Sequence, residues 1–246
     1  MRFAARPGTA RKVFRLSCAA LAIGMLGISQ VAPAGAQVVG SISVESDVRF
    51  RGYSMSNGDP AATIDLGYEH RSGLYLNGAA TAGVVHSDPV LLGYQLNAGY
   101  STWVSPTVSI DAGVVRNAYT RHARGIRDTH YTEFYLGMAT RGISSRIYYS
   151  PDYFRPDKHT LYGELEGTLN LAPKWRLNGH VGLLTYLNDA PRNARREHYD
   201  WRVTLGRSLG KLDLRASLSS AGPGNDYYYG RRHSATALTF GASLPF

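Results

Sequence analysis

Cysteine, charge and long apolar runs are all scarce in this 246-residue sequence. It contains one cysteine, Cys18, and only 18% of its residues are charged. A single thiol excludes a disulfide framework and a thiolate metal site. No apolar run after residue 36 approaches the roughly 18 residues that a membrane-spanning helix needs. Disorder is excluded as well, because 43% hydrophobic and 11% aromatic residues are too many for an unfolded chain.

Residues 1–36 have the features of a secretory signal peptide. Five basic residues and no acidic one lie within residues 1–15, and a mostly apolar stretch follows over 16–28. Ala34-Gly35-Ala36 then precedes Gln37, as an A-x-A cleavage site would. We expect a mature chain of residues 37–246, with an N-terminal membrane helix as the alternative. Removing the five leader cations leaves 22 of 27 basic residues against 18 acidic ones, which argues against nucleic acid as a partner.

After residue 36 the apolar residues recur with a period of two. Within 160–171, Leu161 and Leu165 share one face, whereas Glu164 lies on the other. Successive side chains of a strand point to opposite faces, so this pattern predicts a strand with one apolar and one polar side. Twelve such segments are expected, near 41–53, 61–71, 74–85, 91–104, 107–119, 130–141, 145–154, 160–171, 175–186, 199–208, 212–220 and 235–246.

Short and long connections alternate between these segments. Turns with Gly or Pro fall at 72–73, 105–106, 142–144, 172–174 and 209–211, and longer links fall at 54–60, 86–90, 120–129, 155–159, 187–198 and 221–234. Short turns at one end and longer loops at the other are typical of an outer-membrane barrel. The sequence therefore predicts an all-β, transmembrane, antiparallel up-and-down β-barrel of about twelve strands in the outer membrane of a Gram-negative bacterium.

The charged face of the strands is expected to line a hydrated lumen, and the apolar face is expected to contact lipid. A soluble barrel or sandwich would show the same period with its apolar face inward, so the alternation alone leaves both readings open. Tyr and Trp near strand ends favour the membrane reading, because such residues form girdles at bilayer interfaces. The expected lumen-lining residues are Glu45, Asp47, Arg49, Arg51, Asp65, Glu69, Asp111, Glu133, Arg141, Glu164, Glu166, Asp213 and Arg215.

The last strand ends in alternating apolar residues. Phe240, Leu244 and the terminal Phe246 share one face. This ending resembles the signal by which outer-membrane barrels are recognised by their assembly machinery. We therefore expect the barrel-assembly machinery to be a partner.

Residues 45–56, which read ESDVRFRGYSMS, carry a family resemblance together with the later stretch GYEHRSGLY at 67–75. Both are similar to the opening of the TorF-type porin family, also called the Gcw_chp group, whose pattern is roughly S-D-Y-x-F-R-G-x-S-x-S followed by H-x-S-G-x-Y. Val48 departs from the aromatic residue usual there. The resemblance implies a Gram-negative outer-membrane porin whose solute is not assigned. We expect it to let small hydrophilic solutes diffuse passively, with no cofactor, no metal and no enzymatic activity.

Charges at 47–51 suggest a ladder within the lumen. If residues 41–53 form one strand, Asp47, Arg49 and Arg51 rise on one face and reach carboxylates such as Asp65 and Glu69 on the neighbouring strand. Such a ladder either sets the field that a solute meets or serves only as a structural set of salt bridges.

The long links are mildly basic, which indicates an anion preference at the mouth, contact with lipopolysaccharide phosphates, or merely solvated loops. Outer-membrane lipid and lipopolysaccharide are thus expected partners. The arginines concerned are Arg121, Arg124, Arg127, Arg192, Arg195, Arg196, Arg231 and Arg232.

Two other classes of function stay open beside the porin. A small outer-membrane hydrolase would need Ser or Thr beside a His, and His70 with Ser72 and His130 with Thr132 have the spacing for one strand face. With eight histidines in the chain, such pairs are expected by chance. A structural or adhesin-like barrel without a conducting path is the third class, since twelve strands give a bore that an inward loop could block.

Overall fold

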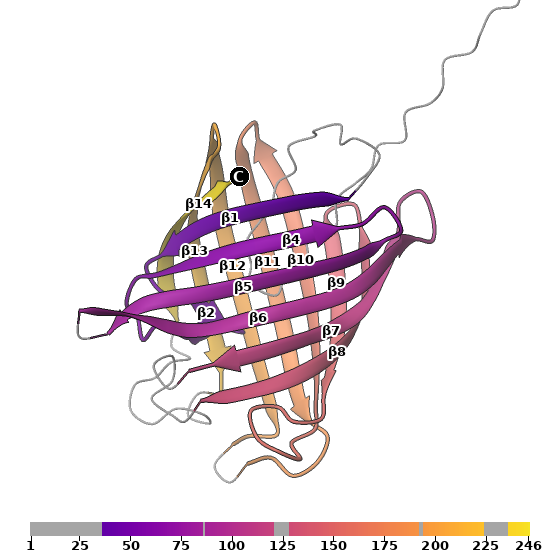
Figure 1. Ribbon diagram of the computed structural model, residues 1–246, viewed down its shortest axis with the longest axis vertical. Coiled ribbons are helices and arrows are strands. Elements are labelled where there is room, and N and C mark those ends of the chain that lie inside the picture. Colours follow the sequence, from indigo (N-terminus) through magenta and orange to yellow (C-terminus); the bar gives the residue numbers. More distant parts are fainter. Residues whose placement is uncertain (1–35, 86, 121–127, 192–193, 224–235) are drawn as a thin grey trace, which may run out of the picture. The chain divides into compact units, whose positions relative to one another are not determined.

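Twelve long strands close into one antiparallel barrel in a computed structural model of the chain (Figure 1). The structure describes residues 36–85, 87–120, 128–191, 194–223 and 236–246, so the signal peptide expected at 1–36 lies almost entirely outside the described residues. Around the barrel the order is β1, β14, β13, β12, β11, β10, β9, β8, β7, β6, β5 and β4, and the last of these pairs with the first. This confirms the predicted fold class.

The strands agree with the segments expected from the period-two pattern, apart from their ends and the first segment. The two-residue strands β2 and β3 pair only with each other and are not part of the barrel wall. The bounds are β1 Gln37–Glu45, β2 Arg49–Phe50, β3 Tyr53–Ser54, β4 Ala61–Glu69, β5 Leu74–Val85, β6 Asp88–Trp103, β7 Ser109–Tyr119, β8 Thr129–Thr140, β9 Ile143–Ser150, β10 Thr160–Ala172, β11 Trp175–Tyr186, β12 Glu197–Leu209, β13 Leu212–Gly222 and β14 Ala237–Pro245.

The outer face of the barrel is apolar and the inner face is polar. Leu165 is 49% exposed and Leu214 is 37% exposed, whereas Arg215 is only 8% exposed. Since the barrel is closed, exposed leucines alternating with buried charged residues place the leucines outside. The reading with the apolar face inward is therefore wrong, and the outside has the surface of a barrel that sits in lipid. The described residues include no helix long and apolar enough to span a bilayer.

Barrel closure brings the two chain ends of the sheet together. Ile42 of β1 pairs with Leu244 of β14. Beyond the paired residues, the Phe246 amide donates to Gly40 O at 2.9 Å, and the Gly40 amide donates to Phe246 O at 3.2 Å. A Cβ on Gly40 would stand 2.5 Å from the Phe246 ring, so the glycine makes room for the terminal aromatic side chain.

The alternation of short turns and long loops is largely as expected. We call the side with the connections 46–60, 120–128, 151–159, 187–196 and 223–236 the long-loop end, and the other side the short-turn end. One expected long link is absent, because β5 runs to Val85 and β6 begins at Asp88. Residues 88–90 of the link expected at 86–90 therefore belong to β6.

The expected first strand, 41–53, is wrong beyond Glu45. The chain leaves the wall there and returns to it only at Ala61, at the start of β4. Between these points β2 and β3 form a small hairpin, with Phe50 paired to Tyr53. This hairpin is not part of the wall. Most of its side chains are buried because it folds into the interior of the barrel. We call residues 46–60 the inward hairpin.

Candidate functional site: the barrel interior and its inward hairpin

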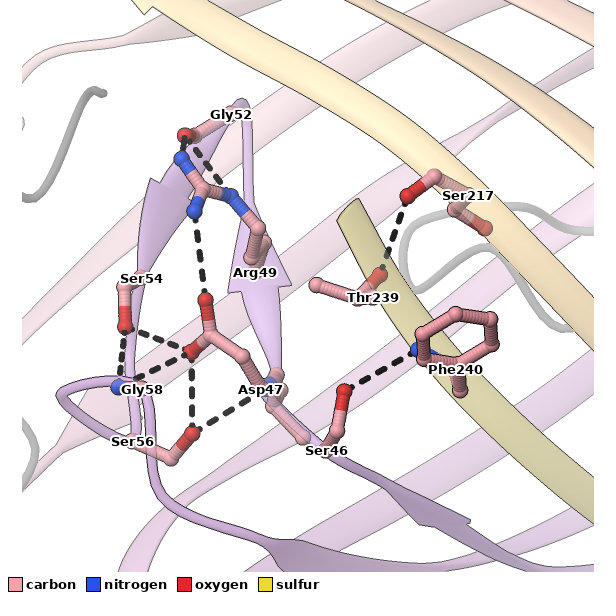
Figure 2. Close-up of polar contacts among 11 residues, drawn as sticks. Ser46, Asp47, Arg49, Gly52, Ser54, Ser56, Gly58, Ser217, Thr239 and Phe240 are labelled. Atoms are coloured by element: carbon pink, nitrogen blue, oxygen red, sulfur yellow. Dashed lines mark hydrogen bonds and ion pairs between the residues drawn. The ribbon is translucent and has the colours of Figure 1, made fainter. Parts of the chain in front are cut away.

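The inward hairpin is held in shape by the carboxylate of Asp47 (Figure 2). This carboxylate accepts hydrogen bonds from Ser54 Oγ at 2.6 Å, Ser56 Oγ at 3.1 Å and the Gly58 amide at 3.3 Å. It also forms an ion pair with Arg49 at 3.1 Å. Four donors on one buried carboxylate fold the segment upon itself, since each charge-assisted bond contributes about 1.5–3 kcal/mol.

The tip of the hairpin is a two-residue turn formed by Arg51 and Gly52. Both have positive φ, 45° and 75°, as a type I′ turn between two strands requires. Gly52 is also needed for space, because its Cβ would stand 2.6 Å from Ser220 O on β13. Arg49 supports the turn by donating from Nη2 to Gly52 O at 2.5 Å. The turn therefore projects the Arg51 side chain away from the hairpin.

Arg51 reaches the wall opposite the strands that carry the hairpin. Counting along the closed order, β9 lies six strands from β1 and β10 lies six strands from β4, which is halfway around a barrel of twelve strands. The guanidinium donates to Glu133 Oε1 on β8 at 2.8 Å and lies 3.7 Å from the Tyr162 ring centroid on β10. Tyr148 of β9 and Tyr153 are 5.4 and 5.6 Å away. We call Glu133, Tyr148, Tyr153 and Tyr162 the Arg51 cage.

Both arginines of the hairpin are shielded from water, with different outcomes. Burial lowers the pKa of Arg49, and the Asp47 carboxylate offsets this only in part. Burial acts in the same direction on Arg51, but the Glu133 carboxylate and the neighbouring tyrosines together outweigh it and raise the pKa of Arg51 above its ordinary value. Arg51 is accordingly a firmly charged group at the tip.

Tyrosines expected in a girdle on the outside pack instead around the hairpin. Tyr131 and Tyr186 are 0% exposed. Tyr131 meets the Tyr153 ring edge-on at 4.8 Å, and Tyr53 bonds His198 Nδ1 at 3.1 Å. By contrast, Tyr199 is 56% exposed on the outer face. The girdle interpretation is therefore wrong for these buried tyrosines, whose rings pack together in the barrel interior beside the hairpin.

Below the hairpin, charged side chains on the wall meet across intervening glycines. Glu45 of β1 and Arg215 of β13 form an ion pair at 3.1 Å, and Gly241 of β14 lies in register between them. In the same way, Asp111 of β7 pairs with Arg146 of β9 at 2.8 Å over Gly137 of β8. A Cβ on Gly137 would stand 2.1 Å from Asp111 Oδ1. We call such an arrangement a glycine-spanned pair.

Two further contacts also cross glycines. Arg176 of β11 extends over Gly206, its register partner on β12, to pair with Asp213 of β13, which is in register with Ser208. A Cβ on Gly206 would come within 2.9 Å of the guanidinium carbon. The hydroxyls of Tyr75 on β5 and Tyr135 on β8 meet over two glycines, Gly99 and Gly113, which are in register between them. In each case the polar side chains extend sideways along the wall, since the glycine has no side chain and leaves room for them.

A third interior group is centred on His180 of β11. Its Nδ1 lies 3.2 Å from Glu166, and its Nε2 lies 2.8 Å from Asp200. Arg202 contacts Glu166 at 3.4 Å. The Tyr162 hydroxyl donates to Asp200 at 3.1 Å, so this group connects to the Arg51 cage. Within the described parts of the chain, no set of three or more His, Cys, Asp and Glu side chains is arranged to hold a metal ion.

The structure places the predicted lumen residues in three groups. Glu45, Asp65, Asp111, Glu133, Glu164, Glu166, Asp213 and Arg215 lie on the inner face of the wall. Asp47, Arg49 and Arg51 belong to the inward hairpin, so the expected ladder along a strand is wrong. Asp65 accepts from Ser41 Oγ at 3.4 Å instead. Glu69 is exposed at the end of β4, and Arg141 is exposed in the turn after β8.

Several interior residues were not among the candidates. They occupy the same alternate positions as the predicted ones, opposite outward apolar neighbours such as Ile147 and Val203. The period-two pattern could have identified them, whereas their partners could not be read without the register. These residues are Arg146, Arg176, His180, Asp200, Arg202, Tyr75, Tyr135, Tyr148 and Tyr162.

The two His–hydroxyl pairs differ in the structure. Ser72 Oγ lies 2.8 Å from His70 Nδ1, but the Ser72 amide also donates to this nitrogen at 3.2 Å. Both contacts belong to an exposed turn at the short-turn end. Thr132 Oγ1 accepts from Arg116 Nη1 at 2.7 Å. Neither arrangement favours a nucleophile activated by histidine.

The class that the fold and the interior define is a porin-type β-barrel. The chain belongs to the family described as "Bacterial protein of unknown function (Gcw_chp)", whose model matches residues 29–227. No curated protein matches the sequence. Arg121, Arg124, Arg127, Arg192, Arg231 and Arg232, expected at the rim, lie outside the described residues.

Solved structures of similar fold are outer-membrane porins and channels. The NanC porin in a rhombohedral crystal form has a TM-score of 0.54 and 10% identity, over 85% of this chain and 99% of that one. The KdgM porin in complex with disordered oligogalacturonate has a TM-score of 0.50 and 10% identity over the same shares. The COG4313 outer membrane channel from Pseudomonas putida F1 has a TM-score of 0.50 and 14% identity, over 90% and 99%. These likenesses establish the fold.

Proposed function

We propose that this protein is an outer-membrane channel for the passive diffusion of small hydrophilic solutes. The observation that carries the proposal is the set of glycine-spanned pairs. Because side chains such as Arg146 and Arg215 extend along the wall, they occupy less of the bore than charges pointing to its axis would. The apolar outer face, the charged inner face and the similarity of the fold to solved porins support the same function.

The inward hairpin would then form the constriction of this channel. Bacterial outer-membrane barrels have short periplasmic turns and long outer loops. The long-loop end accordingly faces outward, and a solute entering from outside meets the hairpin first. Arg51 and Glu133 are the charged groups at this narrow point.

Planar-bilayer recording on the refolded full barrel tests the channel. We expect defined conductance steps in potassium chloride, and liposome swelling with small neutral sugars that stops at larger ones. A matched preparation of detergent carried through refolding without protein is the control. Electrical silence and absence of swelling from a barrel of native circular dichroism would overturn the proposal in favour of a structural or adhesin-like role.

The assembly machinery and the lipid remain proposed partners. Phe240, Leu244 and Phe246 share the outer face of the last strand, where Phe246 is 66% exposed. Phe246→Ala is expected to lower the amount of barrel inserted in cells several-fold, with unchanged refolding of the purified chain in detergent. Equal insertion of the native protein and the Phe246→Ala variant, measured by heat-modified gel mobility of outer-membrane fractions, would contradict an assembly role. Of the proposed lipopolysaccharide contacts, Arg195 and Arg196 are exposed at the long-loop end.

A further inference from the structure

The Arg51 cage has the composition of a binding site for an organic cation. Three tyrosine rings and one carboxylate surround the guanidinium, which is 3.7 Å from the nearest ring centroid and 2.8 Å from Glu133. Aromatic faces attract cations through their quadrupole, most strongly where water is excluded. A carboxylate at hydrogen-bond distance adds charge and direction for a planar guanidinium.

Three of the four cage residues, Glu133, Tyr148 and Tyr162, lie on wall strands, whereas Tyr153 lies in the connection after β9. The hairpin adds only the Phe50 ring, 5.0 Å from the guanidinium. Glu133 accepts from Asn117 Nδ2 at 3.2 Å. The Tyr148 hydroxyl donates to Glu164 at 3.0 Å, and the Tyr162 hydroxyl donates to Asp200 at 3.1 Å. These bonds join β7 to β8, β9 to β10 and β10 to β12, so the wall residues of the site keep their positions when Arg51 leaves.

Arg51 occupies the cage under constraint. It sits at φ 45°, in the left-handed region that costs a non-glycine residue free energy. Among the described residues its Nη1 has no hydrogen-bond partner, so the tether leaves one donor of the buried guanidinium unsatisfied. A free guanidinium could turn to satisfy more donors than this tethered one does.

We propose that the Arg51 cage is a binding site for a guanidinium or similar small organic cation, and that Arg51 is its tethered occupant. An entering cation displaces Arg51 and releases the hairpin from the opposite wall. A further acidic group, Glu164, follows on β10 toward the short-turn end and favours passage of the same charge. Binding at the cage is independent of conduction, and only the identity of the solute rests on the proposed channel function.

Competition with the tether gives the test its direction. A tethered group acts at an effective concentration in the millimolar range or above, so free ligand must compete with it. Removing Arg51 vacates the cage, and we expect Arg51→Ala to bind methylguanidinium at least tenfold more tightly than the native protein. Arg195→Ala removes an exposed arginine of the long-loop end that lies outside the hairpin and the cage, so it should bind as the native protein does.

Isothermal titration of methylguanidinium chloride into the refolded barrel in detergent, against a sodium chloride blank, measures this binding. The double variant Arg51→Ala/Glu133→Gln should lose the gain, and Arg51→Ala/Tyr162→Leu serves the same purpose if the first does not fold. The proposal is overturned if Arg51→Ala binds no better than the native barrel or either double variant. Binding without conductance would refute the channel and retain the cage, whereas conductance without binding would do the reverse.

Discussion

The wall and the inward hairpin use the same residue types in opposite ways. On the wall, Asp111 and Arg146 meet over Gly137 and extend along the sheet. On the hairpin, Arg51 crosses from one side of the barrel to Glu133 on the other. What lies between the two charges makes the difference: a glycine in register allows a contact within the wall, and an inward turn produces a contact across the bore. The wall pairs join strands of the barrel, and the Arg51–Glu133 pair fixes the hairpin to the wall near the entrance.

The largest effect is expected from filling a glycine of the wall. In Gly137→Val the new Cβ would stand 2.1 Å from Asp111 Oδ1 and 2.8 Å from Arg146 Cγ, so the ion pair must separate. Breaking a buried pair costs about 3–5 kcal/mol, and the free energy of unfolding should fall by that order in urea titrations of the barrel in vesicles. Gly163→Val is the control, because nothing lies within 4 Å of its Cβ. Equal losses in both variants would refute the role of glycine-spanned pairs.

A smaller change in stability but a visible change in conduction is expected from the hairpin tip. Arg51→Ala removes the ion pair and the ring contacts that hold the tip on the opposite wall. The free energy of unfolding should fall by about 1–3 kcal/mol, less than for a wall pair because the released hairpin lets water reach Glu133. Mean single-channel conductance should rise. Arg195→Ala, at an exposed arginine of the long-loop end, should change neither. An unchanged conductance in Arg51→Ala would show that the hairpin is not the constriction.

The smallest effect is expected within the hairpin. Asp47→Asn keeps the shape of the side chain but loses the charge that accepts from Ser54 Oγ, Ser56 Oγ and Arg49. Local opening should become easier by about 1.4 kcal/mol, so the Met55 amide should exchange with deuterium roughly tenfold faster. Exchange in β7 and β8 should not change. Asp59→Asn, at an exposed carboxylate of the same segment, is the matched control, and equal acceleration there would contradict the role of Asp47.

Period-two alternation, together with the alternation of short and long connections, was enough to predict the closed barrel and its twelve wall strands, whereas the choice of the inner face needed other signals. It failed at residues 46–53 because Val48 and Phe50 still alternate with Arg49 and Arg51, as they would in a strand. Local pattern cannot distinguish a strand in the wall from a hairpin folded inward when both bury one face. Tertiary contacts such as Arg51 with Glu133 decide between them, and these join residues 82 positions apart.

The glycine-spanned pairs were beyond the reach of the sequence for a related reason. Glycines falling singly in strands are visible, but each pair depends on the register of three strands. Glu45, Gly241 and Arg215 come from β1, β14 and β13, and only barrel closure makes the first two neighbours. The buried tyrosines were misplaced similarly, since a tyrosine near a strand end suits either a lipid interface or a filled entrance.

Glycine-spanned pairs also define how this barrel can vary. Gly137 cannot gain volume while Asp111 and Arg146 retain theirs, because all three share one space. A tolerated exchange would have to enlarge the middle residue and shorten both flanking ones at once. The three residues, one from each of three strands, should therefore change together in evolution and in design. Substituting one of them at a time would show only that each single change is not tolerated.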